Sequence, residues 1–120
     1  MDAKELMIGD WVYDTLSQTN IKVNRGCFEI NPLNGIGYEE NLIPIPLTAE
    51  ILGKNHFSRF AKVNWLYDTL STFFLENPSN PNDYKDNYWL RVGNIMTRIE
   101  YVHQLQHAMR LCGIYKEIEL

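Results

Sequence analysis

The closing segment of the chain, residues 99–113 with the sequence IEYVHQLQHAMRLCG, constrains the fold more than any other stretch. Its apolar side chains recur every three or four residues and therefore share one face of a helix. That stripe consists of Ile99, Val102, Leu105, Met109 and Cys112. Gly113 follows the stripe at a position where glycine often ends a helix. The pattern predicts a helix over residues 99–112, with its stripe packed on a pleated layer and its histidines facing solvent.

The N-terminal part of the chain carries short strand patterns separated by turn residues. Residues 11–16 alternate as a strand should, and the turn SQTN joins them to a second strand pattern around residues 21–23. These two patterns predict a hairpin. Residues 27–30 form a further predicted strand, and the pair Asn34-Gly35 marks a second turn.

Residues 36–47 are expected to be extended throughout. Pro44 and Pro46 lie in this segment, and proline has no backbone N–H to donate to a neighbouring strand. The segment therefore fits only an edge strand or a stretch that covers the sheet. Together with the preceding hairpin, it predicts a meander of short, strongly bent strands that resembles a small barrel.

A short helix is predicted over residues 48–54. Thr48 is a good N-cap, and Glu50 suits the positive end of the helix dipole. The following residues, 57–76, allow two interpretations. Their apolar side chains recur at helical spacing, but their content of Val, Trp, Tyr, Thr and Phe favours strands. We prefer strands at about residues 60–67 and 71–76, with a helix as the alternative.

The remaining segments complete the predicted element order. Residues 77–87 form a polar loop rich in asparagine and proline, and residues 88–94 form another strand. Residues 114–120 alternate and could end the chain as an edge strand.

A seven-residue repeat raises the question of internal duplication. The sequence WVYDTLS at residues 11–17 returns as WLYDTLS at residues 65–71. A true duplication should extend over a whole supersecondary unit, but here the flanking residues differ. The repeat therefore indicates one strand-and-turn solution used in two separate hairpins.

Length and composition indicate an ordinary globular chain. The sequence has 120 residues, of which 45% are hydrophobic and 22% are charged, enough for one core and one domain over residues 1–120. The predicted fold class is α+β. It consists of a bent antiparallel sheet or partial SH3-like barrel, a short helix near residues 48–54 and a longer C-terminal helix near residues 99–112.

Charge and patterning exclude several classes of function. The 11 basic and 15 acidic residues give a formal charge of -4, so binding to a phosphate backbone is not expected. The N-terminus lacks a secretory signal pattern, and no apolar run approaches the roughly 20 residues of a membrane span. We therefore expect a cytoplasmic protein with no membrane association, in which Cys27 and Cys112 are ordinary thiols.

His103 and His107 are the strongest candidates for metal-binding or catalytic residues, because their i, i+4 spacing places them on adjacent turns of one helix. Zinc binds imidazole and carboxylate groups, so Glu100 and His56 could complete an alternative metal set. The pattern HExxH is absent because Gln104 follows His103. The favoured interpretation is therefore a surface pair without metal.

No catalytic residue or cofactor is expected. GxSxG, P-loop and dinucleotide-binding motifs are all absent from the sequence. Gln106 projects close to the apolar stripe, where a buried amide must find hydrogen-bond partners. We interpret Gln106 as a structural polar residue that binds a nearby loop or strand backbone.

Four segments together resemble a group of small uncharacterised bacterial proteins, common in gut anaerobes rich in phage and mobile elements. They are ELMIGDWVY, IPIPLTAEILGKNHF, IEYVHQLQHAMRLCGI and the closing EIEL, in that order, and they leave residues 58–94 uncovered. The motifs PIPLTxEIL and YVHQLQ are the most specific. The resemblance implies an α+β domain beginning with SH3-like strands, and it implies no activity. Members of the group typically have Asn in place of His107 and Pro in place of Ala49.

The function we expect is a non-enzymatic protein-interaction module of phage or mobile-element origin, which binds a protein partner or itself. The expected contact residues are His103, Gln104 and His107 on an exposed helix flank, with Pro44 and Pro46 as a docking edge. One alternative is a metal-binding protein or hydrolase that uses the histidine pair. Another is a small barrel that binds single-stranded nucleic acid.

Overall fold

The structure is a computed structural model, and it describes residues 1–120 except 2, 31, 61–63, 68–69, 77–87 and 93–94. Its contacts group into two compact units, each built from two segments of the chain. The first unit comprises Met1–Pro46 and Tyr101–Leu111, and the second comprises Leu47–Glu100 and Cys112–Leu120. The single domain over residues 1–120 stays a prediction beside this division, and each unit is described by itself.

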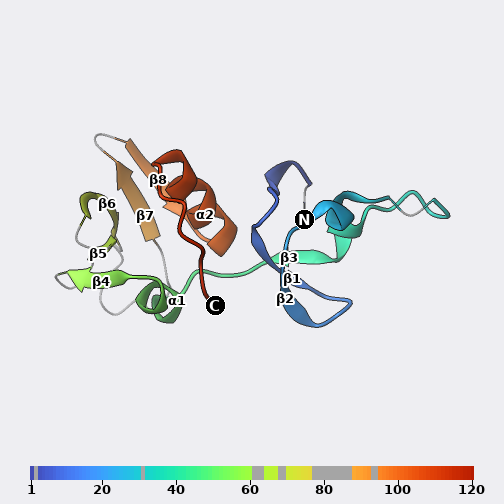
Figure 1. The fold of residues 1–120 in the computed structure, drawn as a ribbon, viewed down its shortest axis with the longest axis horizontal. Helices are drawn as coiled ribbons and strands as arrows, with labels where there is room; N and C mark the ends of the chain where they lie inside the picture. Colours follow the sequence, from blue (N-terminus) through green and yellow to red (C-terminus); the bar gives the residue numbers. More distant parts are fainter. Residues whose placement is uncertain (2, 31, 61–63, 68–69, 77–87, 93–94) are drawn as a thin grey trace. The chain divides into compact units, whose positions relative to one another are not determined.

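The first unit contains a three-stranded antiparallel sheet of order β2-β1-β3 (Figure 1). Its strands are β1 (Trp11–Asp14), β2 (Thr19–Lys22) and β3 (Leu42–Pro44). β1 pairs with both neighbours, so the predicted hairpin of β1 and β2 is confirmed. β3 lies at the edge of the sheet, the position that its proline requires.

The described part of this unit has the short 3-10 helices η1 (Ala3–Glu5), η2 (Arg25–Phe28) and η3 (Tyr38–Asn41). Of these, η2 and η3 interrupt segments that were expected to be extended. The predicted strand at residues 27–30 is therefore wrong, and residues 36–47 are not extended throughout. The cause is local hydrogen bonding. The Cys27 N–H donates to the Asn24 carbonyl and the Glu29 N–H to the Gly26 carbonyl, which are the i to i+3 bonds of a 3-10 turn.

The core of the first unit lies around the central strand. Its buried members are Leu6, Val12, Val23, Cys27 and Leu42, and Met1, Ile21 and Tyr38 pack against them. Helix α2 (Val102–Leu111) belongs to the same unit, and its apolar side chains at positions 102, 105 and 109 are buried. The predicted stripe is therefore buried within the helix, but its predicted last member is not: Cys112 lies just beyond α2 and is exposed.

The second unit contains helix α1 (Ala49–Lys54) and a five-stranded antiparallel sheet of order β4-β5-β6-β7-β8. The Thr48 side chain accepts a hydrogen bond from the Ile51 N–H at 3.3 Å, which confirms the predicted N-cap. The strands are β4 (Phe57–Phe60), β5 (Asn64–Tyr67), β6 (Leu70–Glu76), β7 (Tyr88–Val92) and β8 (Ile95–Ile99). Strands rather than a helix are thus confirmed in residues 57–76, but the single strand predicted at about 60–67 is wrong, because β4 and β5 are separate strands that pair antiparallel. The predicted loop at residues 77–87 lies outside the described residues.

The beginning of the C-terminal helix differs from the prediction. Ile99 ends β8 instead of opening the helix, and α2 begins at Val102. Tyr101 precedes the first turn, where its N–H donates to the Gln104 Oε1 at 3.2 Å. This bond is half of a capping box, which ends the extended backbone and starts the helix at a defined residue.

No strand is assigned within residues 114–120, so the predicted closing edge strand is wrong. A side chain holds this segment instead. The Asn55 Oδ1 accepts from the Glu119 N–H and the Asn55 Nδ2 donates to the Glu119 carbonyl, both at 2.6 Å. The same Nδ2 also donates to the Ile51 carbonyl at 2.7 Å. One buried amide therefore supplies the two bonds that a neighbouring strand would otherwise make.

The two copies of the seven-residue repeat occupy different sheets. The first begins in β1, the centre of the three-stranded sheet, and the second begins in β5, between β4 and β6. Both copies begin in a strand, but the two strands have different neighbours. The two sheets, two α-helices and short 3-10 helices together make an α+β fold, as predicted. The SH3-like character of the strands stays a prediction. Among the described residues, no helix has the length and apolar character needed to cross a membrane.

Candidate functional site

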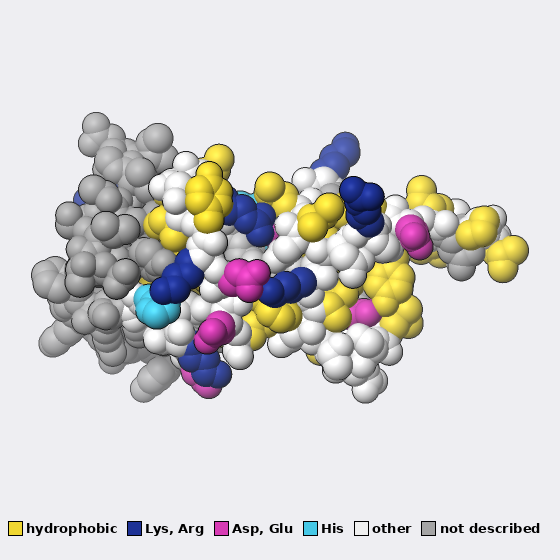
Figure 2. All heavy atoms as spheres, viewed as in Figure 1, with side chains coloured by type: hydrophobic (Ala, Val, Ile, Leu, Met, Phe, Trp, Pro, Cys, Tyr) yellow, Lys and Arg dark blue, Asp and Glu magenta, His cyan; other side chains and the backbone are white. Residues whose placement is uncertain are grey.

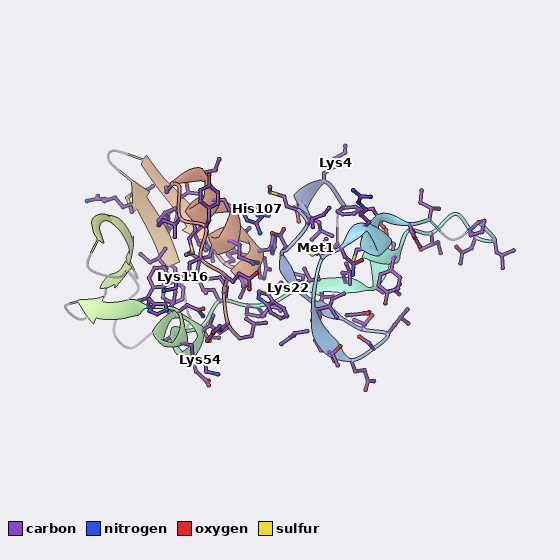
Figure 3. The ribbon with its side chains drawn as sticks, viewed as in Figure 1. Met1, Lys4, Lys22, Lys54, His107 and Lys116 are labelled. Atoms are coloured by element: carbon purple, nitrogen blue, oxygen red, sulfur yellow. The ribbon has the colours of Figure 1, made fainter. Side chains whose placement is uncertain are left out.

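Helix α2 is joined to the loop before β1 through the buried carboxylate of Asp10 (Figure 3 labels His107 on this helix). The Asp10 Oδ2 lies 2.6 Å from the His107 Nε2 and accepts from the Met7 N–H at 2.8 Å. The Asp10 Oδ1 accepts from the Arg110 guanidinium at 3.2 Å. Asp10 is fully buried, so these charge-assisted bonds compensate a carboxylate that water does not reach.

His103 lies beside this network and is only 3% exposed. Its ring stacks on Tyr101, with centroids 5.9 Å apart, and meets His107 edge to face at 5.7 Å. The His103 Nδ1 has no hydrogen-bond partner within the described structure. Burial lowers the pKa of His103, while the nearby Asp10 carboxylate opposes that shift.

The expected solvent-facing histidine pair is therefore wrong. His103 is buried, and His107 is half-buried and turned toward Asp10. The helical wheel placed His103 at the margin of the apolar stripe, and the fold covers that margin. The acid that binds His107 is 97 residues away in the sequence, so no local pattern shows the pair.

The two glutamines of α2 hold backbone groups. The Gln104 Oε1 caps the helix through the Tyr101 N–H, so Gln104 is a half-buried capping residue and not part of an exposed flank. Gln106 binds backbone groups of β1 and of the loop before it, as its sequence position predicts. Its Oε1 accepts from the Trp11 N–H at 2.8 Å, and its Nε2 donates to the Gly9 carbonyl at 3.1 Å.

The expected docking edge at Pro44 and Pro46 is covered by the chain itself. Pro46 forms an isolated antiparallel bridge with Tyr101, and the Ile45 carbonyl accepts from the Val102 N–H at 2.9 Å. Pro44 is half-buried in β3, and Pro46 is exposed. The segment before α2 thus makes the backbone contacts that a partner strand would need.

The alternative metal set does not form a metal centre. No group of three or more His, Cys, Asp or Glu side chains in the described part of the chain could hold a metal ion. His56 is exposed at a positive φ of 68° after α1, and the Glu100 carboxylate pairs with Arg98 at 3.1 Å. His107 directs its Nε2 to Asp10.

The Asp10–His107 pair resembles the base-and-orienter arrangement of many hydrolases, but the described contacts give it no nucleophile. Its recorded partners are the Met7 N–H and the Arg110 guanidinium. The buried Cys27 thiol contacts Asn24 instead, at 3.8 Å. The arrangement therefore serves to hold α2 against the β1 loop.

A second feature, which sequence reasoning missed, is an apolar hairpin that we name the arm, made of the described residues 29–30 and 32–38. Ile30 bridges Gly37, and the Tyr38 N–H donates to the Glu29 carbonyl at 2.9 Å. The turn at Asn34-Gly35 uses the Asn34 side chain as acceptor for the Ile36 N–H. The arm extends away from the three-stranded sheet of its own unit (Figure 1).

The arm exposes large aliphatic side chains and lines a pocket of about 640 Å³, the arm pocket. Leu33 at the tip is 94% exposed, and Ile30, Ile36 and the neighbouring Leu16 are also exposed. Figure 2 shows hydrophobic side chains along the arm and at its end. The pocket is lined by Leu16, Gly26, Glu29, Ile30, Pro32, Leu33, Asn34, Ile36, Gly37, Tyr38 and Asn41.

A hydrogen bond between Asp14 at the end of β1 and Tyr38 in η3 holds the base of the arm pocket. The Tyr38 hydroxyl donates to the Asp14 Oδ2 at 2.5 Å, and this bond lowers the pKa of Asp14 and raises that of Tyr38. The Asp14 Oδ1 also accepts from the Leu16 N–H at 3.0 Å. A charged Asp14 thus fixes both Tyr38 and Leu16 at the pocket. The sequence offered one signal for this surface. Ile30, Leu33 and Ile36 lie close to the turn residues Asn34-Gly35, and the sequence pattern gives them no helix or strand as a partner.

Acid should weaken the first unit through His103. A histidine whose pKa is lowered by burial is neutral in the folded state, whereas unfolded histidine takes up a proton near pH 6.5. Its contribution to stability is therefore complete above about pH 6.5 and is lost as the pH falls below it, by at most about 1.4 kcal/mol per pH unit. We expect urea midpoints to fall between pH 7 and pH 5, and H103L to flatten that fall.

H56N is the matched control for this prediction, because His56 is exposed and Asn tolerates a left-handed backbone. Its pH profile should follow that of the unsubstituted protein. An unchanged slope in H103L would contradict the assignment.

Scans against models of protein families, curated proteins and solved structures each find no match for this chain.

Proposed function

We propose that this protein is a non-enzymatic protein-interaction module, and that its docking surface is the arm pocket together with the exposed side chains of Leu16, Ile30, Leu33 and Ile36. The single observation that carries the proposal is the cluster of exposed aliphatic groups around a pocket. A cluster of this kind on a soluble surface commonly marks a binding site. The phage or mobile-element origin and the SH3-like strands belong to the same proposal, through the resemblance of the sequence motifs.

The structure of the arm supports a docking role. An isolated two-stranded hairpin is only marginally stable in water, and the Leu33 side chain at the tip of the arm is 94% exposed. Burial of such a side chain by a partner would stabilise a complex by roughly 1.5–3 kcal/mol. The volume of about 640 Å³ also lies within the range of roughly 300–1,000 Å³ that is typical of ligand pockets.

The two rival functions have less support in the described residues. Binding of single-stranded nucleic acid needs a basic groove with stacking aromatics, but the arm pocket includes Glu29 and the chain carries a charge of -4. A hydrolase needs a reactive group next to the Asp10–His107 pair, and its recorded partners are instead a backbone N–H and a guanidinium.

Site-specific photo-crosslinking tests the proposal. We would replace Leu33 with the photoreactive residue p-benzoylphenylalanine and irradiate the protein in extract of its native host. Leu111, 89% exposed at the end of α2, is the control position outside the surface. We expect one defined adduct from position 33 and none from position 111. Equal labelling from both positions, or no adduct at position 33, would refute the docking surface.

Substitution of the tip should separate binding from folding. Because the Leu33 side chain is almost fully exposed, L33D should change the free energy of unfolding by less than about 0.5 kcal/mol. The same change should abolish partner capture when L33D carries the photoreactive residue at position 36. Capture that is unaffected by L33D would count against the arm.

A further inference from the structure

We infer that the arm pocket receives a partner segment in which an aliphatic or aromatic side chain lies next to Lys or Arg. This inference rests on the proposed function and adds the chemistry of the partner. It comes from the charges around the pocket, which are independent of the exposed aliphatic groups that define the docking surface.

Three carboxylates belong to residues that line the pocket or adjoin its lining residues along the chain. Glu29 lines it directly. The Glu39 carboxylate lies over Gly37, another lining residue, since a Cβ on Gly37 would meet the Glu39 carboxylate. Glu40 is exposed in η3, between the lining residues Tyr38 and Asn41. In the described part of the chain none of the three carboxylates forms an ion pair or a side-chain hydrogen bond.

Nearby cations do not balance this charge. Arg25 precedes the lining residue Gly26, and it is the one basic residue in residues 24–41, against three acidic ones. The amino group of Met1 donates to the backbone carbonyl of Glu39 at 3.3 Å and not to its carboxylate. Asp14 adds a further carboxylate behind Tyr38, with a pKa lowered by the Tyr38 hydroxyl. The pocket therefore has apolar walls inside an acidic surround.

This combination selects among possible occupants. Contact with the exposed Leu33 and Ile36 side chains favours binding only when the partner brings an apolar group. The carboxylates favour binding when the partner also places a cation next to that apolar group. A nucleic acid or an anionic membrane would meet Glu29, Glu39 and Glu40 with like charge. A second copy of this chain would bring the same three carboxylates to the interface. A partner segment with adjacent apolar and basic side chains satisfies both features.

Two synthetic peptides test the inference directly: acetyl-GLKILKG-amide and its counterpart acetyl-GLEILEG-amide, which share their apolar residues. Methyl NMR shifts of Ile30, Leu33 and Ile36 would be followed in the full chain. We expect shifts with the lysine peptide at millimolar concentration and none with the glutamate peptide. The affinity of the protein for the lysine peptide should fall several-fold between about 50 and about 300 mM salt, because salt screens exposed charge pairs.

Charge reversal at the pocket gives the second readout. E29K and E39K should each lower the affinity for the lysine peptide by about two- to fivefold, the range of one exposed ion pair. E119K is the matched control, because Glu119 is exposed and uses only its backbone in recorded bonds. The partner segment crosslinked at position 33 should also contain Lys or Arg within two residues of the attachment point.

The outcomes separate this inference from the docking function. Equal binding of both peptides with no effect of E29K would overturn the basic partner and leave the docking surface standing. No methyl shift with the lysine peptide would also overturn it. A concentration-dependent dimer in sedimentation, abolished by L33D, would replace the partner with a second copy. Loss of the position 33 adduct would refute the docking function itself.

Discussion

Replacement of Asp10 with alanine is expected to lower the free energy of unfolding by about 3 kcal/mol. The substitution removes the one acceptor shared by the His107 ring, the Arg110 guanidinium and the Met7 N–H. Breaking a buried ion pair by removing one partner typically costs 3–5 kcal/mol. We expect the lower end of that range, because His107 and Arg110 are about one-quarter exposed and water can reach them.

Urea unfolding followed by fluorescence and circular dichroism would measure this loss. E40A is the control, since Glu40 is an exposed acid with no ion pair in the described structure, and it should stay within about 0.5 kcal/mol. D10N keeps the shape of the side chain and should lose less than D10A. In a double-mutant cycle, D10A and H107A should be non-additive by more than about 0.5 kcal/mol. A D10A protein as stable as E40A would contradict the network.

Replacement of Gln106 with leucine should have the second largest effect, about 2–3 kcal/mol. Leucine keeps most of the side-chain volume but leaves the Trp11 N–H and the Gly9 carbonyl without the Gln106 amide. Each buried polar group that loses its partner costs roughly 1–3 kcal/mol, and some relaxation toward water offsets part of that. The bond to Trp11 also fixes the start of β1, so its loss should loosen the central strand.

Hydrogen exchange gives a readout that is specific to Gln106. The Trp11 amide should exchange faster by at least about tenfold in Q106L than in the unsubstituted protein, in line with a local loss above about 1.4 kcal/mol. Q104L is the matched control on the same helix, because Gln104 serves as a cap and its loss should cost about 1 kcal/mol or less. Equal Trp11 exchange rates in Q106L and Q104L would contradict the role of Gln106.

The local elements of the fold were predictable because their signals are local. Thr48 caps α1 as its position before the helix indicates, and the β-branched and aromatic residues of positions 57–76 form strands. The buried apolar stripe of α2 was visible in its spacing. Where the prediction was wrong, a contact from elsewhere or a 3-10 turn overrode the pattern. Ile99 has helical spacing but pairs with Tyr88 as the last residue of β8.

The candidate site was less predictable than the fold. His103 and His107 were recognised as a pair, but their burial and the Asp10 partner were not, because periodicity does not show what covers a helix margin. The apolar side chains within residues 27–38 have a pattern typical of a strand and a turn. Only their exposure in the structure identifies them as a candidate docking surface. The sequence also does not show that the carboxylates of Glu29 and Glu39 lie at the same pocket, because that depends on the fold of the arm.

By itself, the sequence determined the α+β class, the positions of both helices and the need of a buried Gln106 for hydrogen-bond partners, since these follow from spacing and polarity over a few residues. Only the tertiary structure decided that Asp10 meets His107 across 97 positions and that the arm stands exposed beside a pocket. The reason is physical. Backbone propensity acts between neighbours along the chain, whereas burial and the choice of polar partners depend on which distant segments the fold brings together.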